Sequence, residues 1–300
     1  MELQWPLILF TFFMCLSSGI LFAQSVLALK GEGRAFQNTS LVASFVTMVV
    51  GGIAVFLHLQ HWERIFNGFG HITSGITQEL IGVVLLFLAL LVFFLMARRS
   101  EDGSVPAWVA WVGIIVPVIM VAVMGHSYLM EGRPSWNTPM LIVYYLINAA
   151  LMGSLTVLII AAAKKQDGDF ELLKKIVFIS AILQLVALAV YAMVLGASVG
   201  TYADHGTYFD PTLPDIPKVE PAAVIGSLFT GSCALAFWGG AIVVGGILPI
   251  CLSFLLNKAK DAGKTMTYAC ASLVCTAIGG LVWRGLLYVV ALTIFAIFLH

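Results

Sequence analysis

Long apolar segments separated by short polar connections make up almost the whole chain. Eight of these segments are long enough to cross a membrane, since roughly 20 apolar residues span the hydrocarbon core as a helix. The predicted spans are residues 5–29, 40–60, 77–97, 107–127, 140–163, 175–199, 232–256 and 268–297. Most connections are short, so neighbouring helices should pack antiparallel. The pattern predicts an all-α, polytopic bundle of about eight transmembrane helices that forms a single transmembrane domain, residues 1–300.

The composition excludes a soluble domain. Hydrophobic residues make up 61% of the chain and charged residues only 10%, whereas roughly a quarter of the residues of a soluble domain are charged. The net charge is zero, which does not favour a nucleic-acid partner. The five cysteines lie in apolar stretches without a CxxC pair, so they are interpreted as small buried side chains. We therefore expect no metal in this chain.

Basic residues gather in the connections on one side of the predicted membrane. Eleven lysines and arginines lie there, against three on the other side, namely Arg64, Arg133 and Lys218. The positive-inside rule predicts that the rich side is cytoplasmic. With eight spans, both termini then lie outside, on the periplasmic side if the host membrane is a bacterial inner membrane. All six histidines fall at or beyond outer helix ends in this topology.

The connection between the sixth and seventh predicted spans, residues 200–231, is the longest on the outer side. It contains several prolines and acidic residues. Two interpretations remain open. The segment is either an irregular outer loop or a docking surface for a peripheral partner.

The segment 56–82 gathers titratable side chains between the second and third spans. His58 ends the second predicted span, and Glu79 begins the third at a similar depth. A neutral imidazole can accept a hydrogen bond and then a proton from one oxygen of a quinol, and a carboxylate can take the other proton. An acid favoured by the helix dipole is the alternative interpretation of Glu79. We predict that His58 and Glu79 are the catalytic residues of a quinol-oxidising site.

Four further residues are predicted to help bind the quinol. His61 and Arg64 follow His58 at a spacing of three, so they share a face if the helix continues, although Arg64 is also explained as an interfacial arginine. Arg284 lies inside the last predicted span, where an arginine requires a partner or a water-filled cavity. We expect Arg284 to face the bundle interior and Tyr288, one turn further on, to line the same cavity.

Several short segments together resemble the family of membrane anchor subunits of dimethyl sulfoxide reductase. They are QWPLILFTFF, LALKGEGRA, FLHLQHWERIFN, TQELIG and WRGLLY. The predicted layout of eight spans also matches that family. The resemblance assigns the family's quinol-site histidine to His58 and its quinol-site glutamate to Glu79. Because His61 lies so close, which of the two histidines contacts the quinol stays open.

The resemblance also implies a function. The chain would anchor a four-cluster iron–sulfur subunit and a molybdopterin catalytic subunit to the membrane. It would oxidise menaquinol to menaquinone and pass the electrons to the iron–sulfur partner during anaerobic respiration. The clusters and the molybdopterin would belong to the partners, and the substrate of the catalytic partner stays open.

Three alternative functions make different demands on the sequence. A haem b membrane subunit requires histidine pairs on facing helices, and only His58 and His126 are plausible histidines within spans. A secondary transporter predicts interrupted helices in two related halves, and the sequence shows no strong internal repeat. A purely structural anchor would have no use for Glu79 and Arg284 within its spans.

Overall fold

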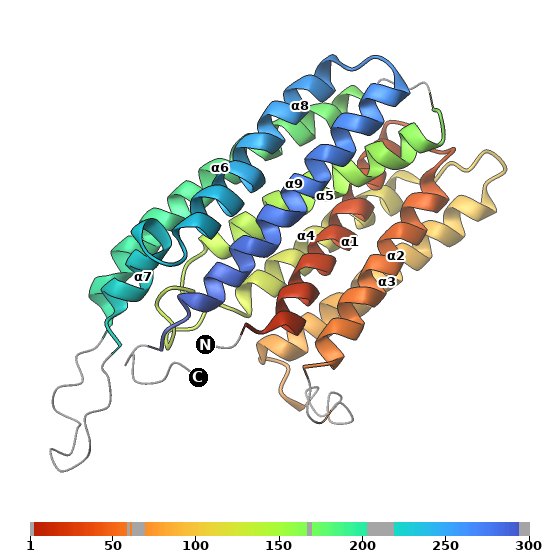
Figure 1. Ribbon diagram of the computed structural model, residues 1–300. Coiled ribbons are helices and arrows are strands. Elements are labelled where there is room, and N and C mark those ends of the chain that lie inside the picture. The colour runs from red at the N-terminus through yellow and green to blue at the C-terminus, as the bar shows by residue number, and fades with distance from the viewer. Residues whose placement is uncertain (1–2, 59–60, 62–69, 167–169, 203–218, 294–300) are drawn as a thin grey trace, which may run out of the picture.

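The computed structural model describes residues 3–58, 61, 70–166, 170–202 and 219–293, and within these residues every regular element is a helix (Figure 1). Eight of the helical stretches are long and apolar enough to cross a membrane, so the predicted all-α bundle of about eight spans is confirmed. The elements are α1 (Trp5–Leu29), α2 (Gln37–Phe56), α3 (Gly75–Arg99), α4 (Ala107–His126), α5 (Met140–Ala163), α6 (Glu171–Ser198), η2 (Val199–Thr201), α7 (Pro221–Thr230), η3 (Leu235–Ile247), α8 (Leu248–Lys258) and α9 (Ala262–Val289).

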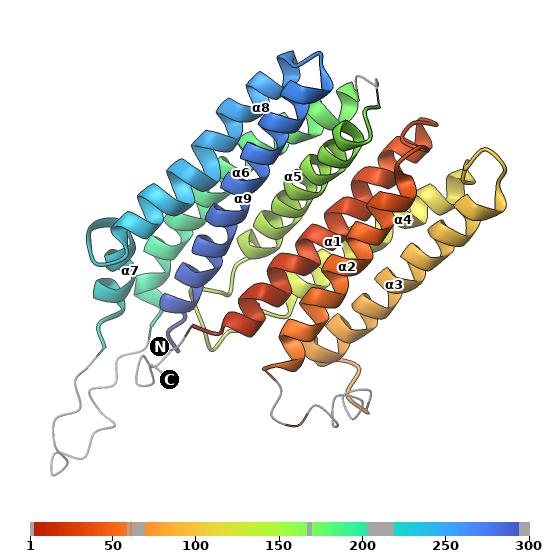
Figure 2. The same cartoon turned by 45° about the vertical axis from the view of Figure 1, so that its right-hand side comes forward.

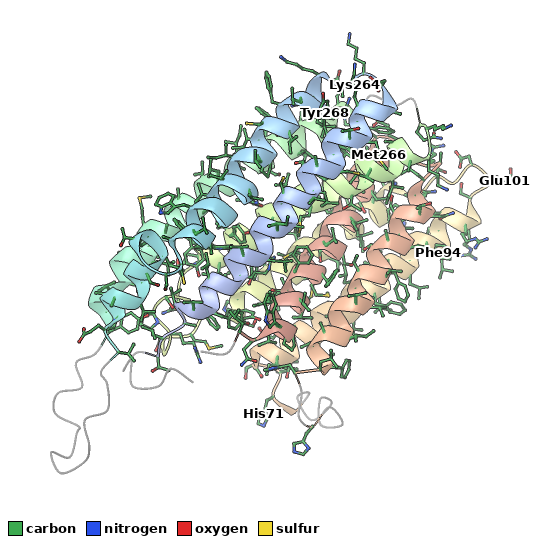
Figure 3. The ribbon with its side chains drawn as sticks, viewed as in Figure 1. His71, Phe94, Glu101, Lys264, Met266 and Tyr268 are labelled. Carbon is green, nitrogen blue, oxygen red and sulfur yellow. The ribbon has the colours of Figure 1, made fainter. Side chains whose placement is uncertain are left out.

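The two ends of the bundle differ in chemistry. At one end, called the histidine end, α2, α4 and α9 finish and α1, α3 and α5 begin (Figure 1), and it carries His58, His61, His71 and His126. The opposite, basic end holds the connections that follow α1, α3, α5 and α8. Figure 3 shows His71 at the first end and Lys264 with Glu101 at the second. This separation of charge is the pattern from which the sequence predicted an orientation.

Helix α1 lies in the middle of the bundle, where it contacts α2, α4, α5 and α9 (Figure 2). Its approach to α5 is very close, because a Cβ atom on Gly19 would lie 1.9 Å from the carbonyl oxygen of Ala149. Its contact with α2 is polar as well as apolar, since the hydroxyls of Ser17 and Ser44 each lie 2.8 Å from the other residue's carbonyl oxygen. Small residues thus let backbones approach, as is typical of helix pairs in membranes.

The seventh span is wider than an ordinary helix over its first half. η3 is a π-helix of 13 residues, and the α-helix α8 continues it. Its closest neighbour is α9, because a Cβ atom on Gly279 would lie 2.0 Å from Cα of Gly245. The side-chain amide of Gln184 on α6 donates to the carbonyl oxygen of Gly245 at 2.7 Å. A neighbouring side chain therefore satisfies a backbone group inside the wide helix, as buried carbonyls require.

The outer connection 200–231, for which an irregular loop and a docking surface both stayed open, contains a helix. Pro221–Thr230 form α7, which starts with a proline whose ring favours the first helical turn. The last span was predicted over residues 268–297, but α9 begins at Ala262 and ends at Val289. Its early start has a local cause, since the carboxylate of Asp261 accepts a hydrogen bond from the backbone N–H of Lys264 at 2.7 Å and caps the helix.

Candidate quinol site at the histidine end

The first turns of α3 bring Glu79 against the end of α4. One carboxylate oxygen of Glu79 is hydrogen-bonded to the hydroxyl of Ser127, the residue that follows α4. The approach depends on Gly75, because a Cβ atom there would lie 2.9 Å from Cβ of Ser127. A glycine in the first turn of α3 therefore lets the end of α4 sit directly beside the carboxyl group.

The contacts of Ser127 suit a carboxyl group that gains and loses a proton. The Ser127 hydroxyl also lies 2.8 Å from the carbonyl oxygen of Met124. A hydroxyl has one hydrogen to donate but can also accept. When Glu79 is protonated, it can donate to Ser127 while Ser127 donates to Met124; when Glu79 is ionised, Ser127 can turn its hydrogen to the carboxylate. Both protonation states of Glu79 thus keep a hydrogen bond.

A wall of aromatic side chains, formed by Tyr128, Trp136 and Tyr288, stands beside this carboxyl group. The Trp136 ring meets Tyr128 edge-on at 5.4 Å and Tyr288 at 5.1 Å between centroids. The hydroxyl of Tyr288 lies 3.4 Å from that of Tyr128. Burial raises the pKa of the Tyr128 phenol well above its ordinary value, and Tyr288, Tyr145 and Glu79 raise it further. Tyr128 directly follows Ser127, the hydrogen-bond partner of Glu79, so the wall begins next to the residue that holds the carboxyl group.

The segment between α4 and α5 holds the wall in place. The Trp136 ring N–H donates to the carbonyl oxygen of Leu287 at 2.9 Å, and the Ser135 hydroxyl donates to Val290 at 2.7 Å. Arg133 donates to the carbonyl oxygen of Ala291 at 2.6 Å and lies over the Trp136 ring. These bonds satisfy carbonyl groups at the end of α9, which an isolated helix leaves unpaired. The end of α9, with Tyr288, is thereby fixed against the connection that carries Trp136.

The two histidines of the candidate site lie at the same end but are exposed. His58 lies two residues beyond Phe56, the last residue of α2, and its backbone N–H donates to the carbonyl oxygen of Val55. His58 and His61 are both exposed, and His71 points away from the bundle (Figure 3). No hydrogen bond joins His58 to Glu79 in the part of the chain that the structure describes. Arg64 lies outside the described residues.

Arg284 lies inside the bundle, as the sequence led us to expect, with only 1% of its surface exposed. Its guanidinium donates to Thr11 Oγ1 at 3.2 Å, to Cys15 Sγ at 3.3 Å, to Asn148 Oδ1 at 3.2 Å and to the carbonyl oxygen of Gly280 at 3.1 Å. The Tyr145 ring lies 4.8 Å from its central carbon, within the range of a cation–π contact. Several neutral dipoles and an aromatic face therefore surround this charge.

The contacts of Arg284 continue across the bundle as a chain of amides. The side chain of Asn148 on α5 donates to Gln184 Oε1 on α6 at 2.9 Å, and Gln184 donates in turn to Gly245 in η3. With Thr11 on α1 and Arg284 on α9, this polar chain joins five elements. Glu79 is not among the hydrogen-bond partners of Arg284 in the described residues.

The sequence did not single out Ser127, Tyr128, Asn148 or Gln184. Asn148 and Gln184 did carry a signal, because a side-chain amide within an apolar span needs a partner. Ser127 and Tyr128 gave no comparable signal, since polar residues after a helix are ordinary. In the described residues no three histidine, cysteine, aspartate or glutamate side chains gather in a way that could hold a metal ion.

The fold and these side chains define a polytopic helical membrane protein with a carboxyl group and an aromatic wall at one end of its bundle. The family model of the DMSO reductase anchor subunit (DmsC) matches residues 1–290, and the chain belongs to this family. It is thus a multi-pass membrane anchor subunit of a DMSO reductase-type complex, which associates with catalytic reductase subunits. A comparison with individual curated proteins gives no significant match.

Proposed function

We propose that this anchor subunit oxidises menaquinol at the histidine end and passes the electrons to an iron–sulfur subunit, which delivers them to a molybdopterin catalytic subunit in anaerobic respiration. The family supplies the anchoring role. The observation that carries the redox role is the Glu79 carboxyl, held by Ser127 and flanked by the aromatic wall. Ionisable side chains inside membrane proteins mark proton pathways, so this carboxyl group supports a proton-transfer role for Glu79.

The chemistry requires groups that accept protons as electrons leave. Oxidation of a quinol to a quinone releases two electrons and two protons. Glu79 is proposed to take one proton from a quinol hydroxyl, and a histidine of the α2–α3 connection, His58 or His61, to take the other. Trp136 and Tyr288 are both buried, so the aromatic wall is proposed to shield the carboxyl group from water while the proton moves. The histidines face the solvent at this end, so protons can leave there.

Binding of a fluorescent quinol analogue to membranes that contain the whole complex tests this proposal. We expect the variants Glu79→Gln and His58→Ala to lose analogue fluorescence quenching, because His58→Ala removes a hydrogen-bonding partner of the quinol and Glu79→Gln replaces a carboxylate, which accepts strongly from a quinol hydroxyl, with a neutral amide. Glu101→Gln, an exposed acid at the opposite end of α3, is the matched control and should bind as the unaltered complex does. If Glu79→Gln and His58→Ala both keep full analogue binding and full quinol-linked turnover, the quinol site does not lie here.

The orientation is part of the same proposal. We propose that the chain lies in a bacterial inner membrane with its basic end in the cytoplasm, so that the histidine end and both termini face the periplasm. A phosphatase reporter that folds only in the periplasm, fused after residue 300, is then expected to be active. A matched fusion within the α5–α6 connection, after Lys165, should be inactive. The opposite pair of results would reverse the orientation.

A further inference from the structure

A cavity of about 410 Å³ opens at the basic end between α6 and α8, at the other end of the molecule from the proposed quinol site. Four lysines line it: Lys174 and Lys175 from α6, and Lys258 and Lys260 from the end of α8. The acid that lines it is Glu171. The lining therefore carries a net positive charge, and its position at the ends of two spans is the level at which lipid headgroups lie.

The floor of this cavity is a buried cation. Lys174 is only 7% exposed, and its ammonium group donates to the carbonyl oxygen of Ala259 at 2.8 Å. Ala259 follows the last residue of α8. The bond fixes the start of α6 against the end of α8, so the two lysine-bearing walls keep their separation.

Among the described residues, the ion pairs near the cavity involve Lys175 and Lys264, and none involves Lys258 or Lys260. Glu171 pairs with Lys175 at 3.3 Å on the exposed surface of α6. The neighbouring Asp261 accepts from the backbone N–H of Lys264 and pairs with its ammonium at 3.6 Å. Lys258 and Lys260 are both exposed. An anion that entered between α6 and α8 would thus meet the ammonium groups of Lys258 and Lys260.

The wall that continues toward the membrane is apolar. The ammonium of Lys258 lies 4.1 Å from the centre of the Phe254 ring, so this charge turns back along the helix toward the lipid-facing surface. Phe254 is 49% exposed and packs against Phe178 of α6 at 6.5 Å between centroids. Ile179 and Leu255, which follow these two residues in the sequence, are exposed as well. Cationic and apolar surfaces therefore meet at one place, as a phospholipid requires.

We propose that this cavity binds the phosphate of an anionic phospholipid, whose acyl chains lie along the apolar surface of α6 and α8. The positive-inside pattern explains why lysines occur at this end, but it does not require that they surround a cavity. Lys164 and Lys165 at the end of α5 show the difference, because they are exposed and do not line the cavity. Basic cavities between spans are suited to anionic headgroups.

The test measures lipids that stay bound to the purified full chain in detergent, by native mass spectrometry with added phosphatidylglycerol or phosphatidylcholine. We expect phosphatidylglycerol to bind in preference. The double variant Lys258→Gln/Lys260→Gln should lower its apparent affinity by roughly tenfold to thirtyfold, since each basic residue near a charged lipid contributes about 1 kcal/mol. Lys164→Gln/Lys165→Gln removes the same charge at the same end and should bind as the unaltered chain does.

Several outcomes would overturn the proposal. They are equal retention of phosphatidylcholine and phosphatidylglycerol, unchanged affinity in Lys258→Gln/Lys260→Gln, or an equal loss in Lys164→Gln/Lys165→Gln, which would mean diffuse attraction to the whole basic end. Inorganic phosphate at the same concentration should not displace the lipid, because it lacks the acyl chains; displacement would assign the site to a free anion. Lys174 is kept in all variants, so the contact between α6 and α8 stays intact.

Discussion

Replacing Glu79 with glutamine is expected to lower quinol-dependent turnover of the complex by two to four orders of magnitude. General acid–base groups contribute factors of this size, and a glutamine amide cannot accept the proton that the carboxylate accepts. The substitution leaves the local packing intact, because glutamine has nearly the same shape and can still hydrogen-bond to Ser127. The measurement is the rate at which the assembled complex reduces its terminal acceptor with a soluble menaquinol analogue as electron donor.

Two controls separate a chemical defect from a failure of assembly. A water-soluble dye that reduces the partner subunits directly should give the same turnover in Glu79→Gln as in the unaltered complex. Ser127→Ala keeps the carboxylate but removes its hydrogen bond, whose net contribution is about 0.5–1.5 kcal/mol, so we expect a loss of roughly twofold to tenfold. Quinol-dependent turnover in Glu79→Gln equal to that of the unaltered complex would remove Glu79 from the mechanism.

The variant Arg284→Met is expected to destabilise the bundle by about 3 kcal/mol, because it leaves buried acceptors without a donor. Each unsatisfied buried group costs about 1–3 kcal/mol, and Thr11, Asn148 and Gly280 all accept from the guanidinium. Methionine fills a similar length, so the change isolates the lost hydrogen bonds from the loss of volume. The measurement is the midpoint of unfolding of the purified chain in detergent, followed by tryptophan fluorescence.

An opposing effect makes this result informative. Removing a buried charge also relieves the free energy of keeping it out of water, and replacing buried ions by apolar side chains is stabilising in some proteins. A higher unfolding midpoint for Arg284→Met would mean that the free energy gained by removing the buried charge exceeds the free energy lost when the buried acceptors have no donor. Arg284→Lys keeps the positive charge but lacks the planar guanidinium group that bonds to several helices at once. Its unfolding midpoint should therefore lie between those of Arg284→Met and the unaltered chain.

The long apolar segments of the sequence were enough to predict the helices, because a membrane leaves few alternatives for such a segment. The match extends to residues 5–29, which α1 occupies as Trp5–Leu29. The interior contacts were less accessible. Gly19 and Gly153 meet in the tightest helix contact, since a Cβ atom on Gly153 would lie 1.9 Å from the carbonyl carbon of Gly19. Nothing in the sequence around either glycine indicates that the two face each other.

At the candidate site, too, the sequence indicated the important residues but not the contacts that they make. Glu79 and Arg284 stand out in a sequence with few charges, and their residue types alone direct attention to them. Their partners do not, because Ser127 is a common residue at a common position and Asn148 lies 136 residues from Arg284 along the chain. These contacts depend on which helices pack together. Apolar spans pack by the shapes of their surfaces, which the pattern of residue types does not indicate. The role of His58 stays a prediction, as does that of Arg64.

The central position of α1 has a consequence for the insertion of the chain into the membrane during synthesis. Helix α1 carries Ser17, Ser18, Gln24 and Ser25 on its buried surface, yet α4 and α5, which contact it extensively, are synthesised after it. Until they arrive, these hydroxyl and amide groups must be sheltered from the hydrocarbon by α2 or by the insertion machinery. Release of α1 alone into lipid would therefore leave its polar side without cover until later spans pack against it.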